Sequence, residues 1–437
     1  MRHAQSLLHD REAPPDGQHR TVWCHRTMRG DTANLWRSGE GARIAGLMTC
    51  GSVWTCPVCS ARVTEARRAE LTTALGRWSE QGGSVSLLTV TFPHRVREHV
   101  KGSDDRPATR FATEVEDLST MLAAFATALE RWKGSRAYRS TMESLDRAGS
   151  VRSLEVTVGD VNGWHPHTHD LLFTRRPVAM FTDEAIDQAA RLLGVKRQPR
   201  TWTRIVAHLR ADPELFERSI TAEYRTLRDA WIARCLKVGL VDVSDVAAMR
   251  LHCLDLRDGE HAAEYVAKFG READGWSLAS ELTRPHAKIG RRRLTSTAEH
   301  YTPFQLLAAA ADGDAWAGFR FRAFAQCFTG RRMLSWSPGL RRELLGADAE
   351  LTDEQLAAAE DELPDEQLAG SITGEQLRVV TSRGMLGELL DYVHAHQADQ
   401  ASIDAYIAEL AVLIPARWRD TIRRRRTFGA GYALMES

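Results

Sequence analysis

The spacing of apolar residues predicts two helices and a strand in the first third of the chain. Apolar side chains recur near helical spacing over Ala61–Gln81, which predicts an amphipathic helix. The run GSVSLLTVTFPH, from Gly83 to His94, is typical of a buried strand that Pro93 closes. A second long helix is predicted over Ala112–Trp132.

A hairpin and a strand–helix pair follow in the middle of the chain. Val151–Val158 alternates in the manner of a strand, and a second strand continues through Leu171. Asp, Asn and Gly in the connection at Gly159–Gly163 are turn formers. Met249–Asp258 predicts a further strand, and Gly259–Gly270 predicts a helix that ends at its last glycine.

The segments between and around these elements are less regular. Residues 1–21 are polar and predict disorder, while Trp23–Arg62 has little periodicity. Phe181–Leu236 predicts a helical insertion, and Trp276–Ser437 is mainly helical by pattern. An acidic stretch over residues 346–366 carries no basic residue and is expected to link two helical parts.

These patterns divide the chain into three regions. Residues 1–80 form a cysteine-rich segment with one helix, and residues 81–275 form the strand-containing domain, with a helical insertion at about 178–245. Residues 276–437 form a mainly helical C-terminal region. The length of 437 residues is sufficient for this number of domains.

Composition is that of a globular protein, with 43% hydrophobic and 27% charged residues. No apolar run approaches the roughly 20 residues that span a bilayer, and the first residues lack the apolar core of a secretory signal. We therefore expect a cytoplasmic protein with no membrane partner.

The formal net charge of zero gives no general argument for nucleic-acid binding. Basic clusters at Gly290–Leu294 and Arg423–Thr427 are candidate phosphate contacts or solvated faces.

Four of the seven cysteines lie before residue 60 and predict a metal site. Cys56 and Cys59 form a C-x-x-C knuckle, and Cys50 and Cys24 complete a set of four thiolates suited to a structural zinc ion. His25 is an alternative to Cys24, and four separately buried thiols are the alternative to a metal site. The remaining cysteines stand in apolar contexts and are expected in the core: Cys235, Cys253 and Cys327.

Three histidines alternate in the second strand of the predicted hairpin. His165, His167 and His169 share one face of that strand, so their imidazoles either bind one cation or serve separate roles. Glu155 lies in the opposite strand and is a further candidate ligand. Imidazole and carboxylate ligands together suit Mn²⁺ or Mg²⁺.

A tyrosine and a lysine lie on one face of the helix predicted over Gly259–Gly270. Tyr265 can act as a covalent nucleophile, and Lys268, three residues later, can offset phosphate charge. The pair is not specific by itself, but it follows a strand downstream of the histidine row.

Three motifs together resemble those of HUH endonucleases, and more closely those of replication initiators of rolling-circle plasmids from actinobacteria. In order they are LLTVTFPH, NGWHPHTHDLLF and AAEYVAKFG. CGSVWTCPVCSARV and FTGRRMLSWSPGL also match that group, and the resemblance covers roughly Cys24 to Leu345. It implies an α+β fold, in which an antiparallel sheet flanked by helices forms the HUH endonuclease core, with the zinc-binding segment before it and the helical region after it.

The resemblance also implies roles for individual residues. His167 and His169 match the His-hydrophobe-His pair, although Thr168 is the middle residue, and His165 or Glu155 supplies the third ligand. Tyr265 matches the nucleophile. Relatives with a single tyrosine can carry a glutamate one helical turn before it to activate water for termination. His261 occupies that position here, so the nearby Glu260 and Glu264 are the remaining candidates.

The implied function is initiation of rolling-circle replication by a nickase. It would cut single-stranded or hairpin plasmid origin DNA through a 5′-phosphotyrosyl intermediate, leave a free 3′-hydroxyl, and then transfer or rejoin the strand. The host helicase and replication machinery are further expected partners. Another HUH nuclease, a relaxase or transposase, is the nearer alternative. The more distant one is a non-catalytic zinc-containing DNA-binding regulator.

Overall fold

The computed structural model describes residues 1–94, 107–159, 162–257, 300–346, 351–359 and 364–412. The chain forms two compact units. The first unit joins residues 1–63 to residues 352–437, and the second unit spans Thr64–Leu351. This grouping cuts across the three regions expected from sequence, because strands from the two ends of the chain pair with each other in the first unit.

A six-stranded antiparallel sheet lies at the centre of the second unit. Its order is β6-β3-β5-β4-β7, and β8 also pairs with β4. The strands are β3 (Ser84–Val90), β4 (Arg147–Gly159), β5 (Gly163–Thr174), β6 (Leu254–Arg257), β7 (His300–Tyr301) and β8 (Leu334–Trp336). β4 and β5 form the predicted hairpin, in which Gly163 adopts a positive φ of 71° that favours glycine.

One face of this sheet is apolar at one end. Leu87, Val151 and Leu171 lie on this face and pack against Leu75 and Trp78 of α2 (Pro57–Glu80). Leu340 and Leu344 of α15 (Leu340–Leu345) complete the same core. Every second residue of a strand points to the same side of the sheet. Polar residues at these alternate positions, beyond the apolar core, therefore lie on the same face as the core.

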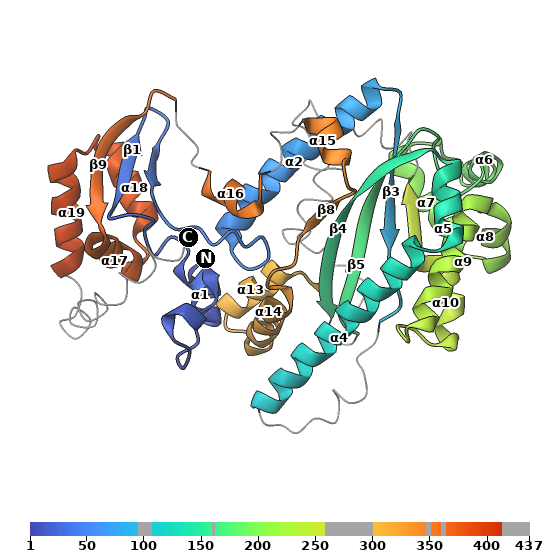
Figure 1. The fold of residues 1–437 in the computed structure, drawn as a ribbon, viewed down its shortest axis with the longest axis horizontal. Coiled ribbons are helices and arrows are strands. Elements are labelled where there is room, and N and C mark those ends of the chain that lie inside the picture. Colours follow the sequence, from blue (N-terminus) through green and yellow to red (C-terminus); the bar gives the residue numbers. More distant parts are fainter. Residues whose placement is uncertain (95–106, 160–161, 258–299, 347–350, 360–363, 413–437) are drawn as a thin grey trace. The chain divides into compact units, whose positions relative to one another are not determined.

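The other face of the sheet is covered by α4 (Pro107–Lys133), which Figure 1 shows in cyan across the strands. Beside it lie α5 (Arg136–Ser144) and α9 (Ala222–Lys237), and the indole of Trp132 in α4 donates to the Leu227 carbonyl at 2.9 Å. The other elements of this unit are α6 (Asp183–Leu192), α7 (Pro199–Arg210), α8 (Pro213–Ser219), η3 (Val243–Asp245), α10 (Val246–His252), α13 (Pro303–Ala311) and α14 (Ala315–Phe328).

The first unit contains a three-stranded antiparallel sheet of order β2-β1-β9. Its strands are β1 (Thr32–Arg37), β2 (Ala42–Ala45) and β9 (Gln367–Thr373). Leu35 and Ile372 form a core with apolar residues of three helices, α17 (Gly374–Arg383), α18 (Leu386–Ala395) and α19 (Gln400–Val412). The short elements α1 (Arg2–Leu8), η1 (Pro15–Gly17), η2 (Arg20–Trp23) and α16 (Asp353–Ala358) complete the unit.

The antiparallel sheets and flanking helices confirm the expected α+β class, and α2, β3, α4 and the hairpin lie where the sequence predicts them. The prediction of disorder for residues 1–21 is wrong. Residues 2–8 form a helix with Ala4 and Gln5 buried, and the Gln5 amide donates to the Cys24 carbonyl at 2.7 Å. This hydrogen bond ties a polar segment to the cysteine-rich one.

Three other local predictions need correction. Trp23–Arg62 contains β1 and β2, and β1 pairs with β2 on one side and with β9, more than 300 residues later, on the other. The strand expected over Met249–Asp258 is shorter, because Met249 is buried in α10 and only Leu254–Arg257 pairs with β3. The C-terminal region is mainly helical in its described part but also contains β7, β8 and β9.

Among the described residues, no helix combines the length and apolar character required to cross a membrane.

Candidate functional site

Glu155, His167 and His169 come together on the polar end of the sheet in the second unit. We call these residues the Glu–His–His group. Glu155 of β4 lies directly opposite His167 of β5 in the antiparallel register. His167 Nε2 lies 3.3 Å from Glu155 Oε2, and His169 Nε2 lies 3.4 Å from Glu155 Oε1. One ligand atom from each of the three residues lies within 4.8 Å of the others, so the group can hold a metal ion.

Hydrogen bonds on the far side of each imidazole orient the group. Thr89 Oγ1 of β3 lies 2.8 Å from His169 Nδ1, and His167 Nδ1 lies 3.2 Å from the His165 carbonyl oxygen. With a proton on each Nδ1, the Nε2 atoms on the Glu155 side would be free to bind a metal ion. Metal-binding histidines use their second nitrogen in this way. The contacts of both rings therefore favour two imidazole ligands beside one carboxylate.

Burial and charge make this carboxylate a strong ligand. Glu155 is 4% exposed, and burial alone would raise its pKa. The neighbouring His169 and His167 outweigh burial and hold the pKa of Glu155 well below its usual range. The group therefore presents an ionised carboxylate in a protected position, which suits a divalent cation.

His165 lies on the same strand but makes different contacts. Its ring stacks on His94 with centroids 4.0 Å apart, and its Nε2 lies 2.5 Å from Thr91 Oγ1. Burial, followed by the charges of His167 and His94, lowers the pKa of His165 well below its usual range. Of the two candidates for a third ligand, the structure brings Glu155 together with His167 and His169 and turns His165 toward His94.

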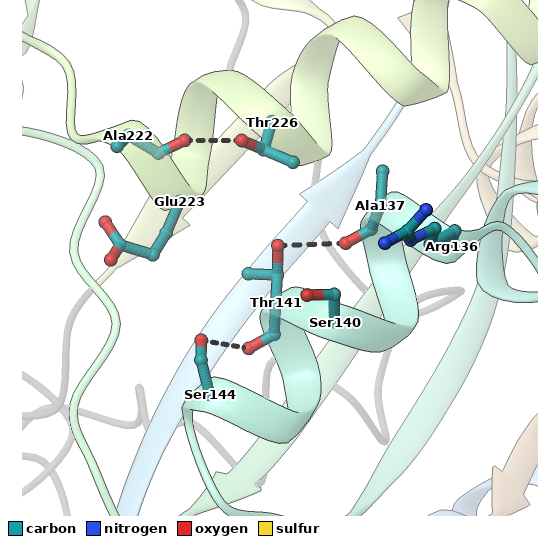
Figure 2. Close-up of a pocket in the computed structure, with 8 residues that line it drawn as sticks. All are labelled: Arg136, Ala137, Ser140, Thr141, Ser144, Ala222, Glu223 and Thr226. Atoms are coloured by element: carbon teal, nitrogen blue, oxygen red, sulfur yellow. Dashed lines mark hydrogen bonds between the residues drawn. The ribbon is translucent and has the colours of Figure 1, made fainter.

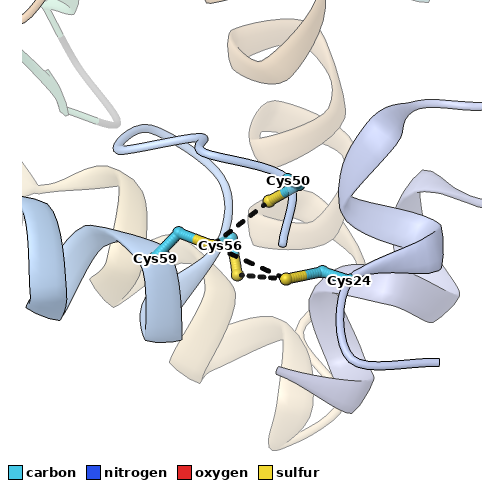
Figure 3. A group of neighbouring side chains, drawn as sticks. All are labelled: Cys24, Cys50, Cys56 and Cys59. Carbon is cyan, nitrogen blue, oxygen red and sulfur yellow. Dashed lines mark hydrogen bonds between the residues drawn. The ribbon is translucent and has the colours of Figure 1, made fainter. Parts of the chain in front are cut away.

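The four N-terminal cysteines form a second group, in the first unit. Cys24, Cys50, Cys56 and Cys59 are buried and point toward one another (Figure 3). The sulfurs of Cys24 and Cys59 lie 3.6 Å apart, those of Cys50 and Cys59 3.7 Å, and those of Cys24 and Cys56 3.6 Å. The sulfurs of a tetrahedral zinc site, with Zn–S bonds of about 2.3 Å, lie about 3.8 Å apart.

Proton sharing in the four-cysteine group also favours a cation. The hydrogen bond with Cys24 lowers the pKa of Cys50, while the same contact raises the pKa of Cys24. The four thiols are therefore coupled, and ionisation of one of them is favoured by hydrogen bonds from the others. A zinc ion binds four thiolates at this spacing, so the donor set fits the metal that the sequence predicts. The fourth member is Cys24, and His25 is not part of the group.

The outlying cysteines are mostly core residues, as predicted. Cys235 and Cys253 are buried, and Cys327 is partly exposed with its sulfur 3.5 Å from the Val115 carbonyl oxygen.

Several predicted site residues lie outside the described part of the chain. These are Tyr265, Lys268, Glu260 and Glu264, together with His261 and both basic clusters. Their roles stay predictions.

Sequence reasoning missed side chains that support the Glu–His–His group. Thr89 and Thr91 are two residues apart in LLTVTFPH, so the sequence alone could have placed both hydroxyls on one face of the strand and its continuation. Asp170 directly follows His169, but it forms ion pairs with Lys133 and Arg152 of other elements. The local sequence around Asp170 therefore could not predict these ion pairs.

A groove of 480 Å³ lies between α5 and α9 in the second unit. Figure 2 shows its lining of small hydroxyl residues between Arg136 and Glu223. The hydroxyls of Thr141 and Thr226 donate to carbonyls of their own helices, at 3.0 Å and 2.8 Å. The groove therefore offers little directed chemistry, and the Glu–His–His group is the better candidate site.

The chain is similar to two known proteins of Streptomyces. The chain is 29% identical over 375 residues to "Protein rep" of Streptomyces lividans, and the match covers 78% of this chain and 74% of that protein. It is also 32% identical over 143 residues to "Neomycin resistance protein" of Streptomyces cyanogenus, covering 31% of this chain and 33% of that protein. No protein-family model and no solved structure matches the chain. The resemblance to an actinobacterial Rep protein is thus confirmed over most of the chain.

Proposed function

We propose that this protein initiates rolling-circle replication of a plasmid by nicking single-stranded origin DNA. The observation that carries the proposal is the Glu–His–His group, since its three ligand atoms lie within 4.8 Å of one another. The similarity to Protein rep supports the general assignment to replication initiators.

In this proposal Glu155, His167 and His169 hold Mn²⁺ or Mg²⁺. Such a cation, when bound, polarises a non-bridging oxygen of the scissile phosphate. The contact between His169 and Thr89 keeps the ring oriented, so the ligands are in place before DNA arrives. The four-cysteine group holds a structural zinc ion in the first unit.

Tyr265 is the proposed nucleophile. Its phenolic oxygen forms a bond to phosphorus while the bond from phosphorus to the 3′-oxygen breaks. The phenol loses its proton to solvent, and the departing 3′-oxygen gains one, which yields a 5′-phosphotyrosyl link and a free 3′-hydroxyl. Lys268 offsets negative charge on the reacting phosphate. Glu260 and Glu264 are the candidates for activating water at termination, since His261 occupies the position expected of a glutamate.

The test is covalent capture of DNA by the full-length protein. Single-stranded oligonucleotides covering the host replicon's origin are incubated with the protein and Mn²⁺, and a denaturing gel reports protein–DNA adducts. We expect an adduct that requires added Mn²⁺ and disappears in Tyr265→Phe. Tyr301→Phe is the matched control, because Tyr301 lies in β7 of the same sheet and should retain the adduct.

Each contrary result identifies another function. An adduct retained in Tyr265→Phe would assign the nucleophile to a different tyrosine. Sequence-specific binding with no adduct on any strand would favour the zinc-containing DNA-binding regulator. Nicking of a conjugative or transposon end in preference to the replicon origin would favour a relaxase or transposase.

A further inference from the structure

Two arginines lie beside the Glu–His–His group at the edge of the same sheet. Strand β6 is the edge strand, and its Asp255 lies opposite Thr89 of β3, which in turn lies opposite His169 of β5. Residues opposite one another across a sheet share a face. Asp255 is therefore on the face of the candidate site, two strand spacings or about 10 Å from His169.

Both arginines contact this one carboxylate. Arg210, the last residue of α7, places Nη2 3.4 Å from Asp255 Oδ1 and 3.2 Å from the Leu254 carbonyl oxygen. Arg257 of β6 places Nε 3.4 Å from Asp255 Oδ2. We call Arg210 and Arg257 the β6 arginine pair.

The Asp255 carboxylate does not satisfy all the hydrogen-bond donors of the two guanidinium groups. Each contact is longer than the roughly 2.7–2.9 Å of a strong charge-assisted hydrogen bond. One negative charge faces two positive charges, so the cluster keeps an excess positive charge. The guanidinium group of Arg257 is exposed, so an additional anion would gain contacts with it that Asp255 does not supply.

The arginine–aspartate cluster is partly exposed to solvent, and its positive charge affects a neighbouring histidine. The side chains of Arg257, Asp255 and Arg210 are 40%, 26% and 18% exposed. Burial, followed by the charge of Arg210, lowers the pKa of the neighbouring His252.

We propose that the β6 arginine pair binds a backbone phosphate of single-stranded DNA next to the Glu–His–His group, and that Asp255 limits the strength of this contact. The proposal rests on the proposed function, which supplies single-stranded DNA as the substrate of that site. Arginine matches phosphate geometry, and contact with the backbone positions the strand without reading its sequence. Asp255 competes for both guanidinium groups, which favours release of the strand after reaction.

The experiment measures binding of a fluorescein-labelled 20-nucleotide oligothymidylate to the full-length protein by anisotropy. No divalent metal is added, and the salt concentration is varied. Arg257→Ala should weaken binding several-fold and reduce the slope of log K against log salt by about 0.7, the value for one lost phosphate contact on a single strand. Asp255→Asn should strengthen binding, because it frees both guanidinium groups.

Arg225→Ala is the matched control. Arg225 is 47% exposed and contacts Glu217, but it belongs to α9 on the other side of the sheet. This variant should bind with the affinity and salt slope of the wild type. Thermal melting of each variant verifies that it folds.

The outcomes separate this proposal from the proposed function. Unchanged affinity and slope in Arg257→Ala, or no gain in Asp255→Asn, would overturn the role of the arginine pair. Equal effects of both variants on a duplex of the same length would replace the single strand with duplex DNA as the ligand. The protein could also bind DNA in an Arg257-dependent way but form no Tyr265 adduct on any origin strand. That result would support the phosphate-binding role of the arginine pair and contradict the proposed nicking function.

Discussion

At the scale of single residues, neighbouring histidines on one strand face have different environments. His167 and His169 direct Nε2 toward Glu155, whereas His165 directs Nε2 to the hydroxyl of Thr91. The difference arises because β3 and the residues that follow it supply different partners to His169 and His165. Thr89 lies beside His169, while Thr91 and His94 lie beside His165.

This difference predicts unequal effects of two alanine substitutions on metal binding. His169→Ala removes a proposed ligand and should lower Mn²⁺ affinity by more than the roughly 10–100-fold that loss of an outer-shell partner costs. His165→Ala should leave Mn²⁺ affinity close to the wild-type value. Isothermal titration of the full-length protein with Mn²⁺, after purification without chelator, measures both.

Glu155→Gln tests the carboxylate in the same titration. It keeps the size of the side chain but removes its charge, and it should weaken Mn²⁺ binding as His169→Ala does. Loss of Mn²⁺ binding in His165→Ala with full binding in Glu155→Gln would mean that His165, not Glu155, is the third ligand.

Sequence could predict the row of histidines but not the choice among them. Alternation in β5 is a local property, so the shared face follows from residue spacing alone. The partners of His169 and His165 are Thr89 in β3 and Thr91 just after it, which lie 80 and 74 residues earlier in the chain. Spacing within β5 carries no information about those contacts.

At the scale of elements, a buried charge holds β5 in register. Asp170 is fully buried on the face opposite the Glu–His–His group. It accepts a hydrogen bond from Lys133 Nζ of α4 at 2.6 Å and lies 3.2 Å from Arg152 Nε of β4. A slip of one residue would turn Asp170 toward the opposite face and reverse the face of each histidine.

Asp170→Asn should therefore destabilise the protein in a pH-dependent way. Burial alone would raise the pKa of Asp170, but Lys133 and Arg152 outweigh it, so the folded pKa lies below the ordinary value. A carboxyl with a depressed folded pKa adds stability above its unfolded pKa, and this stability is lost as pH falls through the folded pKa. The variant should cost about 3–5 kcal/mol at pH 7, as expected for a buried charge left without its partner.

Urea unfolding of the wild type and the variant at several pH values measures this effect. The difference between the two should be largest at pH 7 and should shrink once the pH falls below about 4, near the unfolded pKa of aspartate. Arg225→Ala, on the exposed side of α9, should show little difference at any pH. A difference for Asp170→Asn that is the same at pH 7 and in acid would contradict an electrostatic role for Asp170.

The elements that sequence predicted well are those defined by nearby residues. The β4–β5 hairpin joins strands that are adjacent in the chain, and α2 and α4 have long periodic patterns. β1 and β2 were missed because they are short and because β1, which pairs with β2, also pairs with β9 more than 300 residues later. β6 was predicted too long because Met249 and Leu251 have the apolar pattern of a strand but lie in α10.

At the scale of the whole molecule, the two candidate metal sites belong to different compact units. All four cysteines lie in the first unit, and the Glu–His–His group with its supporting threonine lies in the second. Each unit also has a hydrophobic core of its own. The two sites should therefore respond separately to substitution.

Loss of one zinc ligand tests this separation. The purified protein should contain an equimolar amount of zinc, and Cys50→Ser should abolish it, since a structural zinc site needs all four ligands. The N-terminal segment is tied to the cluster through Gln5 and Thr21, whose side chains contact the Cys24 carbonyl and the Cys50 sulfur. Limited proteolysis should then cut Cys50→Ser within its first 60 residues, while Mn²⁺ binding by the second unit should persist.

Cys327→Ser is the control, because Cys327 is partly exposed and lies outside the four-cysteine group. It should keep its zinc and its resistance to protease. Full zinc content in Cys50→Ser would show that the four thiols are separately buried. Loss of Mn²⁺ binding together with zinc would show that the second unit depends on the first for its fold, since the contacts named above for Glu155, His167 and His169 lie within the second unit.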